Sequence, residues 1–202
     1  MTIIVGTHNR KKGTELLELL APLGIGVQTL ADVPVALEID ETGQTFAENA
    51  ALKATVQAGH LKRWVLGDDS GIVVDALDGE PGVHSARYAG PQATDAENCA
   101  RLLSELGNLE PARRTARFVC HLVLADPTGA IRAESIGTCE GRIIDHEAGA
   151  NGFGYDPLFE IVEYHRTFGQ LGPAAKSCLS HRARAIQALI PQLERLLVVP
   201  RP

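Results

Sequence analysis

The chain has 202 residues, which is enough for one domain or for two closely joined lobes. Its formal net charge of −6 at pH 7 excludes a surface that binds nucleic acid over its whole extent. The N-terminus has no basic segment followed by an apolar stretch, and no run approaches about 20 apolar residues, so we expect neither a secretory signal nor a membrane span.

The first predicted elements are a strand, a polar turn and a helix. Residues 2–6 are apolar and β-branched, which predicts a short buried strand, and the leucine-rich helix that follows ends at Gly24. The N–H groups at the start of such a helix point to the end of the strand and can bind an anion. Residues 33–44 predict a loop, and the capping-box spacing of Thr45 and Glu48 predicts a second helix.

The next segment predicts two strands around an acidic turn. Residues 65–66 lead into Gly-Asp-Asp-Ser-Gly at 67–71, which we interpret as a tight turn, and residues 72–74 predict the second strand. A polar loop follows over residues 78–90. Another capping box then predicts a helix over residues 94–107.

The last part of the chain again combines predicted strands with a predicted helix. Residues 117–125 are nearly all apolar and predict a central strand, and residues 130–144 predict a further strand with glycine interruptions. Residues 149–157 predict a glycine-rich loop. A final helix is expected from Ser180, and it should kink, stop or restart at Pro191. This order of elements predicts an α/β or α+β fold.

One cluster of polar side chains suits phosphate binding. Thr7, Asn9, Lys11 and Lys12 lie at the first strand–helix turn and offer hydroxyl, amide and ammonium donors to phosphate oxygens. The spacing is not that of a P-loop. The plain structural alternative is a solvated, polar start of a helix.

A second cluster suits a metal. The adjacent carboxylates of Asp68 and Asp69 repel each other unless a cation or hydrogen bonds stabilise them. Mg²⁺ usually takes one or two carboxylates together with a substrate phosphate, and Glu41 is a candidate third carboxylate. The alternative is an acidic turn with Gly71 placed for its backbone.

Two further clusters suit a nucleotide. Residues 152–157 combine two glycines, which allow close approach of the backbone, with aromatic rings that can stack on a base. Lys176 and the Ser-His-Arg sequence at 180–182 lie near a predicted helix start and can neutralise phosphate. A packed turn and an ordinary helix start are the structural alternatives.

Six blocks of the sequence resemble those of the noncanonical purine nucleoside triphosphate pyrophosphatases, the inosine triphosphate pyrophosphatase (dITP/XTP pyrophosphatase) family. They follow the family's order and cover nearly the whole chain. In the first block the family commonly has Gly where this chain has His8. The blocks are Thr7-x-Asn9-x-x-Lys12, Glu41-Thr42-Gly43-x-Thr45-Phe46-x-Glu48-Asn49-Ala50-x-x-Lys53-Ala54, Asp68-Asp69-Ser70-Gly71-Ile72-x-Val74-Asp75-Ala76-Leu77, Pro81-Gly82-Val83-x-Ser85-Ala86-Arg87-Tyr88, Gly152-Phe153-Gly154-Tyr155-Asp156-Pro157-x-Phe159 and Lys176-Ser177-x-x-Ser180-His181-Arg182.

The resemblance implies a fold and an activity. The fold is α/β, a single domain over residues 1–202 with a long twisted mixed sheet flanked by helices and two lobes with an active-site cleft between them. The activity is Mg²⁺-dependent hydrolysis of dITP, ITP and XTP to the monophosphate and pyrophosphate, which clears deaminated purines from the nucleotide pool. A homodimer is also implied, and we expect neither a nucleic-acid nor a membrane partner.

Each candidate residue receives a role under this interpretation. The catalytic residues are Asp69, as the base or water-orienting group, and Lys53. The metal ligands are Glu41 and Asp69, with Asp68 close by. The triphosphate is neutralised by Lys12, Lys53, Lys176 and Arg182 and accepts hydrogen bonds from Thr7, Asn9 and Ser70. The base side consists of Phe153, Gly154, Tyr155, Asp156, His181 and Arg182.

Two other functions stay open at this point, a Maf-like pyrophosphatase of other modified nucleotides and a nucleotide-binding module without catalysis. A binding module has no need of the paired carboxylates, so their presence favours an enzyme. The four cysteines form no CxxC pair, which argues against a zinc site and a disulfide framework and suits the reducing cytoplasm.

Overall fold

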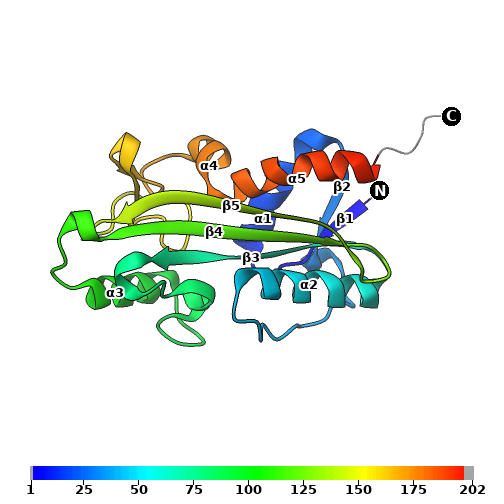
Figure 1. Cartoon of the computed structure of the whole chain (residues 1–202), viewed down its shortest axis with the longest axis horizontal. Coiled ribbons are helices and arrows are strands. Elements are labelled where there is room, and N and C mark those ends of the chain that lie inside the picture. The colour runs from blue at the N-terminus through cyan, green and yellow to red at the C-terminus, as the bar shows by residue number, and fades with distance from the viewer. Residues whose placement is uncertain (1, 198–202) are drawn as a thin grey trace. The chain divides into compact units, whose positions relative to one another are not determined.

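The computed structural model describes residues 2–197 and contains one mixed sheet with helices packed on it (Figure 1). The strand order is β2-β1-β3-β4-β5-β6-β7. The first strand is parallel to both of its neighbours, whereas β6 is antiparallel to β5 and β7. The strands are β1 (Thr2–Val5), β2 (Gly26–Thr29), β3 (Trp64–Val74), β4 (Thr115–Ala125), β5 (Ile131–Ile143), β6 (Phe159–Ile161) and β7 (Arg166–Thr167). The α-helices of this part of the chain are α1 (Arg10–Leu20), α2 (Phe46–Leu61), α3 (Asp95–Leu106), α4 (Pro173–Leu179) and α5 (His181–Leu197). The α/β class is confirmed.

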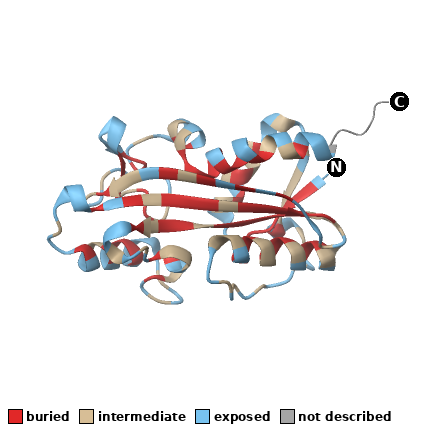
Figure 2. Ribbon diagram, viewed as in Figure 1, coloured by how far each residue is buried: buried red, intermediate tan, exposed pale blue. Residues whose placement is uncertain are grey.

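The chain divides into two compact units. Unit 1 consists of Met1–Asp69, Cys120–Gly137 and Arg182–Pro202, and unit 2 consists of Ser70–Val119 and Thr138–His181. The strands β3, β4 and β5 have 11, 11 and 13 residues, about twice the usual length of a strand, and each passes from one unit into the other. Figure 2 shows buried residues along much of β3 and β4.

The core of unit 1 follows the alternation of side chains along β1. Ile3 and Val5 pack with side chains of α1 and α5, whereas Ile4 packs with the alanines Ala50 and Ala54 of α2. Successive side chains of a strand point to opposite faces, so α1 and α5 cover one face of the sheet here and α2 covers the other. The predicted buried strand is therefore confirmed, and both of its faces are covered.

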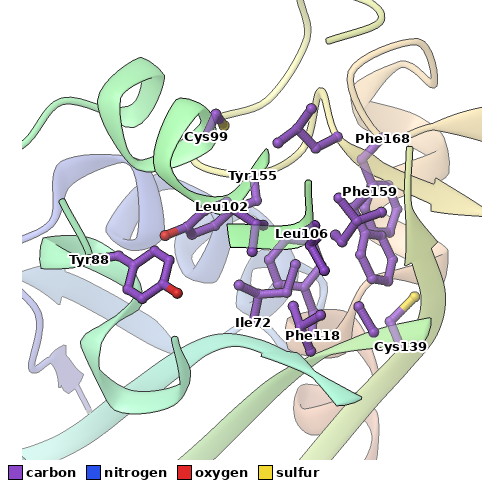
Figure 3. Packing of buried hydrophobic residues seen from close by; sticks show 14 of the residues in the cluster. Ile72, Tyr88, Cys99, Leu102, Leu106, Phe118, Cys139, Tyr155, Phe159 and Phe168 are labelled. Atoms are coloured by element: carbon purple, nitrogen blue, oxygen red, sulfur yellow. The ribbon is translucent and has the colours of Figure 1, made fainter. Parts of the chain in front are cut away.

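The core of unit 2 is aromatic. Phe118 of β4 lies with its ring centroid 4.6 Å from that of Phe159, and Phe159 stacks on Phe168 at 5.8 Å (Figure 3). Leu102 and Leu106 bring the apolar side of α3 into the same cluster. Burial of large apolar side chains of this kind contributes about 1.5–3 kcal/mol each.

Both predicted capping boxes are confirmed. The Thr45 hydroxyl accepts from the Glu48 N–H at 3.2 Å, and the Glu48 carboxylate accepts from the Thr45 N–H at 3.2 Å, so both groups at the start of α2 have partners. Thr94 and Glu97 form the same reciprocal pair at the start of α3. Replacing such a cap by alanine typically costs about 1 kcal/mol.

Three predictions about local structure are wrong in whole or in part. The acidic segment 67–71 is not a turn, because β3 continues through it. The segment 78–90 is not only loop, since a 3₁₀ helix forms over Gly82–Arg87. At Pro191 the predicted stop or restart is wrong because α5 continues through this residue, whereas the alternative of a kink stays a prediction. Within the described residues, no helix has both the length and the hydropathy needed to cross a bilayer.

Candidate active site

The phosphate-binding turn predicted at residues 7–12 leads from β1 into α1. Asn9 is the N-cap of α1, and its Oδ1 accepts from the backbone N–H groups of Lys11 and Lys12 at 3.0 and 3.1 Å. The buried Thr7 hydroxyl accepts from the Asn9 N–H at 3.2 Å. The turn is thus fixed by its own side chains, and it borders a cavity of about 540 Å³ in unit 1.

The two adjacent carboxylates have separate environments. Because Asp68 and Asp69 are consecutive in a continuous strand, their side chains point to opposite faces of the sheet. Asp68 lies on the face of α1 and α5, and Asp69 lies on the face of α2. The predicted repulsion within an acidic turn is therefore replaced by two different sets of partners.

Asp69 is bound by two side chains of α2. The Lys53 ammonium donates to Asp69 Oδ1 at 2.9 Å, and the Asn49 amide donates to Asp69 Oδ2 at 3.3 Å. The same Lys53 nitrogen donates to Glu41 Oε1 at 3.1 Å, so one cation bridges the two carboxylates. The Asn49 Oδ1 in turn accepts from the Gly43 N–H at 2.8 Å, which fixes the loop that carries Glu41.

Gly67 explains how α2 comes so close to β3. A Cβ atom at this position would lie 2.3 Å from the Ala50 carbonyl oxygen and 2.9 Å from the Ala54 nitrogen, both of them backbone atoms of α2. The missing side chain lets the helix rest directly on the strand. Asn49 and Lys53 are four residues apart on α2, so this close approach brings both to Asp69.

Burial and neighbouring charges oppose each other on this face of the sheet. Burial raises the pKa of Asp69 by more than the nearby charge of Lys53 lowers it. For Lys53, burial would lower the pKa, but Asp69 and Glu41 outweigh it, and the pKa of the ammonium is raised. A carboxylate with a raised pKa beside a fixed ammonium is the arrangement expected of a general base.

The other face holds a buried ion pair. Arg182 of α5 is 1% exposed, and its Nε donates to Asp68 Oδ2 at 3.1 Å while Nη1 donates to Glu15 of α1. Burial alone would raise the pKa of Asp68, but the Arg182 guanidinium holds it well below its usual range. The Cys120 thiol lies 3.7 Å from the second oxygen of Asp68. This pair ties β3 to α1 and α5.

In unit 2 the glycine-rich loop and α4 form a second polar group. The Lys176 ammonium donates to Asp156 Oδ2 at 2.5 Å and lies 4.3 Å from the centroid of the Phe153 ring. Asp156 also accepts from the Phe153 N–H at 2.8 Å. Gly152 has φ of +78°, and a Cβ there would collide with Asp156, so only glycine allows this turn.

Two aromatic candidates belong to the core of unit 2. Tyr155 is 4% exposed, and its hydroxyl donates to the Ser85 carbonyl at 2.8 Å. His181 is 5% exposed and stacks on Phe118 with ring centroids 4.8 Å apart. Ser70 is half-buried in β3, and Gly154 has φ of +60° in the loop between Phe153 and Tyr155.

The predicted site residues thus fall into two sets. Unit 1 holds those around the phosphate turn and the carboxylates: Thr7, Asn9, Lys12, Glu41, Lys53, Asp68, Asp69 and Arg182. Unit 2 holds those around the glycine-rich loop: Ser70, Phe153, Gly154, Tyr155, Asp156, Lys176 and His181. The positive charge of Lys12 favours the ionised form of both Asp68 and Asp69, although burial still raises the pKa of Asp69.

Two contact residues were missed by the sequence analysis. Asn49 joins Asp69 to the loop that carries Glu41, and Glu15 is the second acceptor for Arg182. The signal that indicates Asn49 is its spacing of four residues from Lys53 in one helix, which places the two side chains together. Nothing local in the sequence indicates the partner of Glu15.

The carboxylates around Lys53 are the candidate ligands for Mg²⁺. Among the described residues there is no group of three or more His, Cys, Asp or Glu side chains placed to hold a metal ion. Glu41 and Asp69 do converge on one cation, the Lys53 ammonium, and Mg²⁺ commonly takes only one or two carboxylates together with substrate phosphate. This oxygen pair fits Mg²⁺, whereas Asp68 has its oxygens on Arg182 and Cys120.

Comparison with known proteins extends over almost the whole chain. A model of the Ham1 family matches residues 3–192. The dITP/XTP pyrophosphatase of Rhodopirellula baltica is 51% identical over 195 residues, which cover 96% of this chain and 94% of that protein. The dITP/XTP pyrophosphatase of Geobacillus kaustophilus is 48% identical over 195 residues, covering 96% and 95%. The solved structure of a HAM1 protein from Coxiella burnetii matches with a TM-score of 0.87 at 38% identity, over 96% of this chain and 99% of that one.

Proposed function

The chain belongs to the Ham1 family, and we propose that it hydrolyses dITP, ITP and XTP to the monophosphate and pyrophosphate. Such an activity clears deaminated purines from the nucleotide pool. The observation that carries the proposal is the agreement of two facts. Relatives named dITP/XTP pyrophosphatase are about half identical over nearly the full length, and the buried Lys53 joins Asp69 to Glu41 in this chain.

The chemistry assigned to unit 1 is attack of water on the α-phosphorus, with pyrophosphate as the leaving group. Negative charge builds on the phosphate oxygens during such a step, so fixed cations and exact positioning of water supply most of the catalysis. Asp69 is assigned as the general base or water-orienting group, because its carboxylate is held beside Lys53 and Glu41. Lys12 and Lys53 neutralise the phosphates, and Thr7 and Asn9 donate hydrogen bonds.

Glu41 and Asp69 are the residues assigned to hold Mg²⁺, and the ion when bound supplies positive charge to the phosphate oxygens. Asp68 receives a different role from the one expected from the sequence. Since Asp68 fixes the buried Arg182, we assign it to positioning that guanidinium near the phosphates. Arg182 accordingly belongs with the triphosphate, because its partners lie in unit 1.

The base is assigned to unit 2. Phe153 offers an aromatic face, and the glycines on either side of it allow the backbone to approach a ligand. A deaminated purine has a 6-oxo acceptor and an N1–H donor in place of adenine's amino donor and N1 acceptor. The donors assigned to the 6-oxo group are the His181 ring and backbone N–H groups between Phe153 and Asp156, whose own N–H groups bond within the loop. Lys176 is assigned to the phosphates.

The experiment that tests this proposal is a nucleotide panel in which phosphate and pyrophosphate are detected separately. Pyrophosphate from ITP, dITP and XTP, dependent on Mg²⁺, supports the assignment. Preference for modified pyrimidine or methylated nucleotides indicates a Maf-like enzyme instead. Binding of nucleotide with no release of product from any of them indicates a binding module.

We also propose a cytoplasmic homodimer. All four cysteines are free thiols, of which Cys99, Cys120 and Cys139 are buried and Cys178 is exposed, and free thiols are stable in a reducing compartment. Closed two-fold pairing is the commonest form of oligomer. Multi-angle light scattering should give twice the chain mass of 21.6 kDa, and the chain mass alone at working concentration contradicts the dimer.

A further inference from the structure

His8 lies in the phosphate turn, and its side chain has a specific contact. The His8 Nε2 lies 3.1 Å from the Leu37 carbonyl oxygen. A carbonyl can only accept, so Nε2 must carry the proton of this bond. His8 stands between Thr7 and Asn9, and Leu37 is four residues before Glu41 in a loop without regular structure. The bond therefore links the phosphate turn to the loop of a proposed metal ligand.

The same loop is held along one side of α2. The buried Gln57 amide donates to the Leu37 carbonyl at 2.5 Å and accepts from the Leu37 N–H at 3.2 Å. Lys53 contacts Glu41, and Asn49 contacts Gly43. These three α2 residues are spaced by four, so they lie on one helix face, and the loop runs along it in the opposite direction.

We propose that His8 is a positioning residue that couples the phosphate turn to the loop carrying Glu41. α2 holds the loop from one side through Gln57, and His8 holds the same Leu37 peptide from the turn. A glycine at this position would have no side chain to make the bond. Binding of phosphate orders the turn and thereby favours the loop position that presents Glu41. Coupling between two sites is reciprocal, so binding of metal at Glu41 favours the ordered turn.

The inference rests on the proposed function, because it takes Glu41 as a ligand of Mg²⁺. His8→Gly should raise the Mg²⁺ concentration that gives half-maximal activity about threefold to tenfold, the range that one hydrogen bond supplies. The kcat at saturating Mg²⁺ should stay within about twofold, because no group that touches the substrate is removed. His8→Gln keeps an N–H donor at similar reach and should restore the wild-type Mg²⁺ response.

A second histidine supplies the matched control. The His60 Nε2 lies 2.8 Å from the Val35 carbonyl in the same loop, but His60 stands near the end of α2 rather than in the phosphate turn. His60→Ala should leave the Mg²⁺ response unchanged. An equal shift in His60→Ala and His8→Gly overturns the proposal, because it shows general loosening of the loop rather than coupling to the turn.

Hydrogen–deuterium exchange separates this inference from the proposed function. In His8→Gly, peptides covering residues 36–44 should exchange faster than in the wild type, and His8→Gln should restore protection. Unchanged exchange in His8→Gly, or an unchanged Mg²⁺ response, overturns the role of His8. If instead the wild type hydrolyses no nucleoside triphosphate, the proposed function fails, while the exchange comparison still decides whether His8 holds the loop.

Discussion

Asp68 and Asp69 are neighbours in β3, yet their carboxylates lie on opposite faces of the sheet. Asp68 accepts from the Arg182 guanidinium at 3.1 Å, and Asp69 accepts from the Lys53 ammonium at 2.9 Å. Their pKa values move in opposite directions, lowered for Asp68 by Arg182 against the effect of burial and raised for Asp69 by burial. Two consecutive residues therefore have different environments, and we assign a structural role to Asp68 and a catalytic role to Asp69.

The role of Asp69 is tested by Asp69→Asn, which keeps the shape of the side chain and removes its charge and basicity. We expect turnover to fall by a factor of about 10²–10⁴, the usual contribution of a general base. Steady-state kinetics with ITP measures this loss. The thermal unfolding midpoint should change little, because burial already disfavours the charged form of Asp69 and Lys53 keeps its contact with Glu41. Near-normal turnover in this variant contradicts the assignment of the base.

The matched control is the same change one residue earlier. Asp68→Asn leaves the buried Arg182 guanidinium without its charged partner in β3, so we expect the free energy of unfolding to fall by about 3 kcal/mol. Urea denaturation measures it. If Asp68→Asn were as stable as the wild type, the buried pair would have no structural role.

The difference in the free energy of unfolding between the wild type and Asp68→Asn should also depend on pH. The pKa of Asp68 in the folded chain lies below its ordinary value of about 3.9, so the folded state gains stability from this carboxylate above that pH and loses it as the pH falls. Denaturation of wild type and Asp68→Asn in the absence of metal should therefore give the full difference near neutral pH. The difference should shrink below about pH 4, and a difference that widens in acid has the wrong sign.

Close packing at Gly67 is tested by Gly67→Ala. The added Cβ meets backbone atoms of α2 at 2.3 and 2.9 Å, so the helix must move away from β3 and carry Asn49 and Lys53 from Asp69. We expect loss of stability of about 1–3 kcal/mol, as in other overpacked cores, together with a fall in kcat. Kinetics and urea denaturation of the variant measure both.

Gly59→Ala is the control for this change. Gly59 lies in the same helix, and a Cβ atom there has no neighbour within 4 Å. Alanine at an open helical position should increase the stability by about 0.5–1 kcal/mol and leave kcat unchanged. If both alanine variants behaved alike, the contact at Gly67 would not explain the position of α2.

Local signals in the sequence predicted several elements correctly. The capping boxes at Thr45 and Thr94 and the apolar run of β4 depend on neighbouring residues only, and all three are confirmed. The prediction of a turn at residues 67–71 was wrong because Gly67 and Gly71 are residues typical of a turn. In the structure both glycines serve close packing, the first against α2 and the second against Ser85. The need for close packing at these glycines depends on segments that are distant in the sequence, so local patterns do not indicate it.

The candidate site was predictable as a set of residue types but not as a set of contacts. Resemblance to a family assigned Glu41, Lys53 and Asp69 to one site. In the structure the Lys53 ammonium contacts both carboxylates. The pairing of Arg182 with Asp68 spans 114 positions of the sequence, and no local pattern indicates it. Burial raises the pKa of Asp69, and the burial of this residue likewise depends on the whole fold.

The most direct test of the central claim is kcat/KM for ITP, dITP, XTP, GTP and ATP under one condition, with pyrophosphate and orthophosphate measured separately. A donor aimed at a 6-oxo group meets the amino group of adenine donor against donor, which leaves a buried polar group without a partner. Discrimination against GTP must come from its 2-amino group. We expect the deaminated purines to exceed ATP and GTP by at least about two decades, with pyrophosphate as the product. Equal values for ATP and ITP, or stepwise release of orthophosphate, would contradict the account.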